Sequence, residues 1–93
     1  MAQDECGETS ADALYELGIM HASGRSVPVD LVSAHKWFNI AAMRGNQEAV
    51  RLRREIAAEM SDAEIGAAQR AARDWLKANP QAPDQMPEIR AAA

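Results

Sequence analysis

The segment from Ala34 to Ala49, AHKWFNIAAMRGNQEA, constrains the fold because it places bulky aromatic residues next to very small ones. At helical spacing, four residues share one face: Ala34, Phe38, Ala41 and Ala42. Trp37 lies beside this face, and the alternation of large and small side chains allows a neighbouring helix to approach closely and interlock. Gly45 and the residue after it can then reverse the chain. The segment therefore predicts a helix packed tightly in an antiparallel hairpin.

Three further helices are predicted from the starts and stops around this segment. Four residues can cap helices: Ser10, Asp30, Asn46 and Ser61. We expect the first helix to start after Ser10 and stop at the segment GRSVPVD, the second to span about 31–44 and the third about 47–60. The fourth is expected to start after Ser61 and to end at Asn79-Pro80. Gly24 suits the left-handed position that ends a helix, and Ser61 with Glu64 forms a capping box. No stretch of the 93 residues alternates apolar and polar positions, so the chain is expected to be one all-α domain.

Composition excludes several classes of function. The net charge of −4 argues against a nucleic-acid partner, since phosphate binding needs a basic face. No apolar run approaches the roughly 20 residues of a membrane span. The start, MAQDECGETS, lacks the pattern of a signal peptide, so a cytoplasmic location is the simplest expectation, although removal of such a peptide beforehand stays open.

Residues 11–49 resemble a Sel1-like repeat, a relative of the tetratricopeptide repeat built from paired helices. The matching positions, in the order of the family pattern, are Ala13, Tyr15, Leu17, Gly18, Gly24, Val27, Asp30, Ala34, Trp37, Ala41, Ala42 and Gly45. Two positions depart from it: Ser26 stands where a second glycine is expected, and His21 where tyrosine is usual. The resemblance implies an αα-hairpin with two additional C-terminal capping helices in a right-handed αα superhelix.

A second repeat starts and is then abandoned. One period after Ala13, Ala49 fits the pattern, but Arg51 and Arg53-Arg54 stand where tyrosine and Leu-Gly would be needed. We therefore divide the chain into a flexible N-terminus (1–9), a helical domain (10–79) and a disordered tail (80–93). The domain holds the repeat over residues 11–49 and the capping helices over 47–79.

The resemblance also implies a non-catalytic scaffold or adaptor for protein–protein contact. Solenoid repeats do not bury their faces alone, so one repeat must be closed by its own last helix, by a second copy, or by another protein. The first helix carries an apolar strip beside acidic residues, and we expect its partner-binding residues to be Asp12, Tyr15, Glu16 and Ile19. The alternatives are that the last helix covers this strip, or that it meets its twin in a homodimer.

An enzyme is the second hypothesis. Ser33 and Lys36 fit the Ser-x-x-Lys pattern of serine β-lactamases, in which a desolvated lysine can act as the base. No Ser-Asp-Asn or Lys-Thr-Gly follows, and nothing supplies an obvious oxyanion hole. The favoured interpretation is a polar helical turn with a solvated lysine and no catalytic residue.

Metal and cofactor sites are not expected. His21, His35 and Cys6 show no ligand spacing, so we place His21 in the core or at its edge and His35 on the surface. The basic cluster from Arg51 to Glu55, with Arg44 nearby, could bind an acidic helix or a phosphate. A solvated face balanced by glutamates is the favoured interpretation.

Overall fold

The computed structural model describes residues 10–80, which form four helices and contain no strand. The helices are α1 (Ala11–Ser23), α2 (Leu31–Met43), α3 (Gln47–Ala57) and α4 (Asp62–Ala78). The predicted all-α fold class is therefore confirmed. The flexible N-terminus expected over residues 1–9 lies outside the described residues, as does the tail after Pro80.

Each helix begins where the capping residues predict. The side chains of Ser10, Asp30, Asn46 and Ser61 each accept a hydrogen bond from the backbone N–H three residues on, at 2.9–3.1 Å. At α4 the bond is reciprocal, because the Ser61 N–H donates to the Glu64 carboxylate at 2.8 Å. These bonds satisfy backbone donors that a helix start leaves without partners.

The end of α3 differs from the prediction. The helix stops at Ala57 and not at Met60. The backbone N–H groups of Glu59 and Met60 donate to Ile56 and Ala57, three residues back, at 2.9 and 3.1 Å. The last turn therefore tightens from α-helical to three-residue bonds, as helix ends often do. It leads straight into the Ser61 cap of α4.

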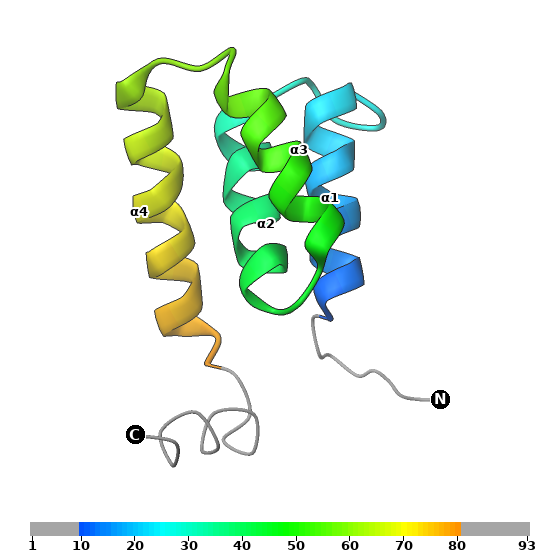
Figure 1. Ribbon diagram of the computed structural model, residues 1–93, viewed down its shortest axis with the longest axis vertical. Helices are drawn as coiled ribbons and strands as arrows, with labels where there is room; N and C mark the ends of the chain where they lie inside the picture. The colour runs from blue at the N-terminus through cyan, green and yellow to red at the C-terminus, as the bar shows by residue number, and fades with distance from the viewer. Residues whose placement is uncertain (1–9, 81–93) are drawn as a thin grey trace.

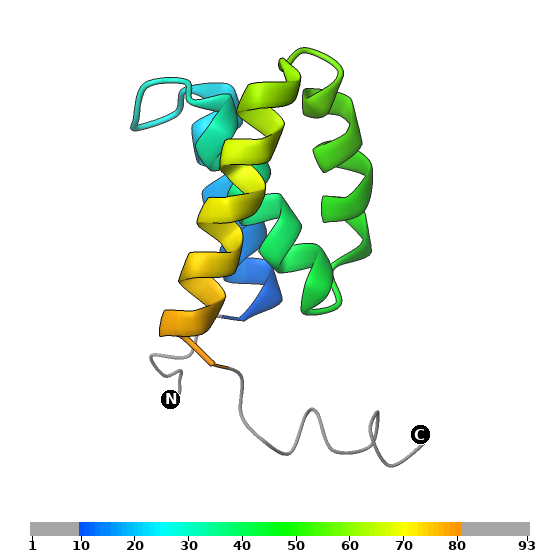
Figure 2. The ribbon, with the colours of Figure 1, turned by 90° about the vertical axis from the view of Figure 1, so that its left-hand side faces the viewer.

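The central element is α2, which packs against each of the other three helices. Helices α1 and α4 lie on opposite sides of α2, and α3 lies across its front (Figure 1). In the view turned by 90°, α4 runs along the face toward the viewer with α1 behind it and α3 to one side (Figure 2). The core therefore forms around α2 rather than between two equal layers.

The seam between α1 and α2 shows the predicted interlocking of large and small residues. Phe38 is 1% exposed, and a Cβ atom placed on Gly18 would come within 3.0 Å of three atoms of its ring. Gly18 is therefore the gap into which the Phe38 ring fits. Tyr15 lies against the same ring, with the two centroids 6.0 Å apart.

Burial around α2 is wider than one stripe. Ile40 is fully buried and His35 is 4% exposed, although neither belongs to the predicted seam. The expectation that His35 is a surface residue is wrong. The reason is that α2 contacts helices on three sides, and a helix enclosed in this way buries residues around most of its circumference.

Aromatic residues join α4 to the hairpin. Trp75 meets Trp37 edge-on, with ring centroids 5.6 Å apart and planes at 82°. The Arg44 guanidinium lies 5.3 Å from the centroid of Trp75 and donates a hydrogen bond to the Asn79 carbonyl at 3.0 Å. The last helix thus packs on the repeat of its own chain.

Candidate functional site

The predicted partner-binding residues lie on one flank of α1 but differ in exposure. Asp12 and Glu16 are exposed, whereas Tyr15 and Ile19 are half-buried and pack against the core. The Asp12 carboxylate accepts a hydrogen bond from the Asn46 side chain at 3.2 Å. Glu16 lies 3.8 Å from Arg25, an exposed pair that contributes little to stability. Tyr15 and Ile19 therefore stabilise the fold, and only part of each side chain is accessible to a partner.

The last helix does not cover this flank. It lies against the opposite side of α2 from α1 (Figure 1). The alternative in which α4 closes the strip is therefore wrong. The geometric reason is that the Trp37–Trp75 contact draws α4 to the other side of the central helix.

Ser33 and Lys36 have separate partners in this structure. The Ser33 hydroxyl donates to one carboxylate oxygen of Asp30 at 2.9 Å, and its backbone N–H donates to the other at 3.1 Å. These hydrogen bonds hold the pKa of the Asp30 carboxyl below its usual range. The Lys36 ammonium lies 4.1 Å from the centroid of Trp37. Ser33 therefore reinforces a helix cap, and Lys36 makes a cation–π contact.

His35 is the titratable group that burial affects most clearly. Burial lowers the pKa of its imidazole, and the positive charge of Arg53 lowers that pKa further. Its Nδ1 is buried without a hydrogen-bond partner among the described residues. Within residues 10–80, no three His, Cys, Asp or Glu side chains gather as a metal ion would require, and Cys6 lies outside that range.

The arginines of the basic cluster contact different partners. Arg51 pairs with Glu48 and, at 2.7 Å, with Glu55 on its own helix. Arg53 donates to the Asn39 side chain of α2 at 2.9 Å. These contacts agree with the favoured interpretation of a face balanced by glutamates.

The loop between α1 and α2 keeps its glycine-type geometry without its second glycine. Gly24 ends α1 with φ of +79°, and its N–H donates to the Met20 carbonyl at 3.0 Å. Ser26 then adopts φ of +72°, a left-handed conformation that is unfavourable for a residue with a Cβ atom. The loop closes when the Asp30 N–H donates to the His21 carbonyl at 3.0 Å.

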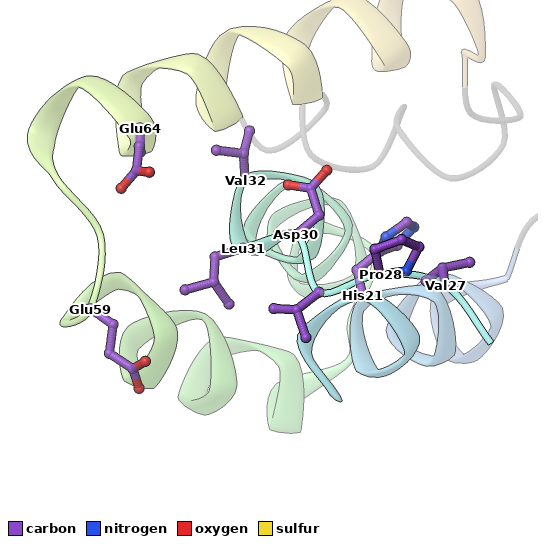
Figure 3. A pocket seen from close by; sticks show the side chains of 9 residues that line it. His21, Val27, Pro28, Asp30, Leu31, Val32, Glu59 and Glu64 are labelled. Carbon is purple, nitrogen blue, oxygen red and sulfur yellow. The ribbon is translucent and has the colours of Figure 1, made fainter. Parts of the chain in front are cut away.

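Sequence reasoning missed a groove beside this loop. Its lining combines residues of the loop, the first turn of α2, and both sides of the α3–α4 connection (Figure 3). Its volume is about 500 Å³, and its rim includes Glu59 and Glu64. The apolar loop residues and the acidic residues near the capping box were both visible in the sequence. Nothing in their spacing indicated that they would meet, because they are about 30 residues apart in the chain.

No helix among residues 10–80 is both long enough and apolar enough to span a bilayer. Comparison with known proteins gives one family: residues 11–46 match the family described as Sel1 repeat. Neither the curated proteins nor the solved structures contain a significant match. Sel1 repeats are helical hairpins of the tetratricopeptide type that generally mediate protein–protein interactions. The matched residues form the α1–α2 hairpin with its Gly18–Phe38 seam, so this hairpin is similar to a Sel1 repeat.

Proposed function

We propose that the protein is a non-catalytic interaction module or small adaptor, built on one Sel1-like repeat, whose partner is another protein. The observation that carries this proposal is the flank of α1 that α4 leaves uncovered among residues 10–80. A repeat of this type has two sides along the stacking direction, and here α4 packs on the opposite side of α2. A partner can add to α1 as a neighbouring repeat would.

We place the contact on the strip defined by Asp12, Tyr15, Glu16 and Ile19. The exposed carboxylates of Asp12 and Glu16 flank two half-buried apolar side chains, so the strip combines partly accessible apolar area with negative charge. This combination favours a partner with a basic rim around an apolar centre. A second copy of the chain is the alternative occupant, although it would bring the same carboxylates together.

The hydrolase alternative is less favoured. Ser33 is engaged by Asp30, and Lys36 faces the ring of Trp37. Incubation with a chromogenic β-lactam and a panel of activated esters tests this alternative directly. Turnover by the wild-type protein that Ser33→Ala abolishes would contradict a non-catalytic role. A cytoplasmic location also belongs to the proposal, supported by the single cysteine of the chain.

The test of the strip must spare the core. Tyr15→Ala and Ile19→Asp would remove packing against Phe38 and its neighbours, so the loss of a partner could then reflect unfolding. A double variant is therefore used: Glu16→Lys reverses the charge, and Tyr15→Phe removes the hydroxyl but keeps the ring that packs against Phe38. Immobilised wild type and the double variant are compared by quantitative mass spectrometry of proteins captured from lysate.

The matched control is Asp74→Lys, the same charge reversal at an exposed position of α4. We expect the α1 double variant to lose a specific captured protein that the control retains. Light scattering across a range of concentrations separates the second occupant, since a homodimer would dissociate on dilution. Equal capture by all three proteins would contradict a binding role for the strip.

A further inference from the structure

A second recognition surface is suggested by the groove at the end of the molecule where α2 begins. Apolar side chains line it, including Val27, Val29 and Leu31, and Glu59 and Glu64 face them from the α3–α4 connection. His21 and Asp30 also line the groove, and no lysine or arginine among residues 10–80 does so. An apolar lining beside exposed carboxylates is complementary to a side chain that is both apolar and cationic.

The close-up view shows how these side chains lie. Leu31 is directed into the space between Glu59, in the α3–α4 connection, and Glu64, in the first turn of α4 (Figure 3). Val29 is 59% exposed at the same end. The apolar floor is therefore open to solvent rather than covered by another described element.

The acidic residues are not equivalent. Both carboxylate oxygens of Asp30 already accept hydrogen bonds from Ser33, so Asp30 belongs to the helix cap. Glu64 accepts from the Ser61 N–H through Oε1 only, which leaves its second oxygen available. Glu59 is exposed and takes part in none of the ion pairs found among residues 10–80. Glu59 and Glu64 are thus the pair that can receive a cation.

We propose that this groove binds a short protein segment in which an arginine or lysine lies next to a leucine-sized apolar residue. The cationic side chain pairs with Glu59 or Glu64, and the apolar side chain contacts Leu31 and Val29. The groove uses none of the α1 strip residues, so this proposal stands independently of a partner at the strip.

The experiment is an NMR titration of the full-length, ¹⁵N-labelled protein with three synthetic eight-residue peptides. The first alternates arginine and leucine, the second replaces arginine by glutamate, and the third replaces leucine by serine. We expect the first peptide alone to shift the backbone amide signals of residues 27–32 and 59–64 in a saturable manner. Weaker binding at higher salt is expected, because the carboxylates are exposed.

The test variant is the double substitution Glu59→Gln and Glu64→Gln, which keeps the fold because glutamine also completes a capping box. We expect its affinity for the arginine–leucine peptide to fall about fivefold, as for the loss of two exposed charge pairs. Asp74→Asn, which removes one exposed carboxylate from α4 outside both the groove and the α1 strip, should leave the affinity unchanged.

Three results would overturn the proposal: shifts centred on another surface, equal binding of the glutamate–leucine peptide, or unchanged affinity in the double variant. Failure of the strip proposal would look different. The lysate partner would then be insensitive to Glu16→Lys, while the peptide titration would still map to the groove.

Discussion

At the scale of single residues, the close approach of α1 and α2 depends on the absence of one side chain. Because a Cβ atom at position 18 would overlap the Phe38 ring, Gly18→Ala should destabilise the protein by about 1–3 kcal/mol. Gly66→Ala in α4 is the matched control. Its Cβ atom would meet only the flexible Arg70 side chain at 3.5 Å, so it should stabilise the helix by about 0.5–1 kcal/mol. Urea unfolding followed by circular dichroism measures both, and changes of the same sign would contradict this account.

Ser26 provides a second prediction at this scale. A left-handed conformation costs a residue with a Cβ atom about 1–2 kcal/mol of folding free energy. Glycine avoids this strain, but it lowers the stability by about 0.4–1 kcal/mol because the unfolded chain gains conformational freedom. Ser26→Gly should therefore raise the free energy of unfolding by roughly 0.5–1 kcal/mol. Ser26→Ala retains the Cβ atom and should give no such gain. Chemical denaturation of the two variants decides, and a gain of equal size in both would count against conformational strain at Ser26.

At the scale of secondary-structure elements, the Trp37–Trp75 contact governs how α4 docks. Trp75→Ala removes a half-buried indole and should reduce the free energy of unfolding by about 2 kcal/mol. Trp75→Phe keeps a ring edge against Trp37 and should lose clearly less. Thermal and urea unfolding at 222 nm provide the comparison. Equal losses in the two variants would mean that the aromatic contact adds nothing to the docking of α4.

The boundaries of these elements were largely predictable from the sequence, because they depend on local chemistry. Ser10, Asp30, Asn46 and Ser61 act through hydrogen bonds that span three residues, so each helix start follows from its own neighbourhood. The burial of His35 was not predictable in this way. It depends on where α3 and α4 fold back, and that placement rests on contacts far apart in the sequence. The groove near Leu31 was missed for the same reason.

At the scale of the whole molecule, α2 joins the other three helices. The recurring contacts between helices all include α2, and the largest fully buried side chains come from α1 and α2: Leu14, Phe38 and Ile40. A change in the interior of α2 therefore affects every interface at once. This arrangement makes a single buried group on α2 a sensitive reporter of global stability.

His35 is that group. Because burial and the charge of Arg53 lower its pKa in the folded state, the unfolded chain binds a proton more readily near pH 6.5. The stabilising effect of a neutral His35 is thus complete above pH 6.5 and is lost as the pH falls through 6.5 toward the lower folded-state pKa. The loss cannot exceed about 1.4 kcal/mol per pH unit for one proton.

The difference in unfolding free energy between pH 7.5 and pH 5 measures this effect, and it can be compared between variants whose absolute stabilities differ. We expect wild type to lose more stability over this interval than His35→Met, because methionine fills a similar volume but has no titratable group. The Asp30 carboxyl, whose pKa is also lowered, contributes only at more acidic pH, as the pH falls below 3.8. The two groups therefore titrate in separate ranges. Identical pH dependence in wild type and His35→Met would show that burial of His35 does not govern the acid sensitivity of the fold.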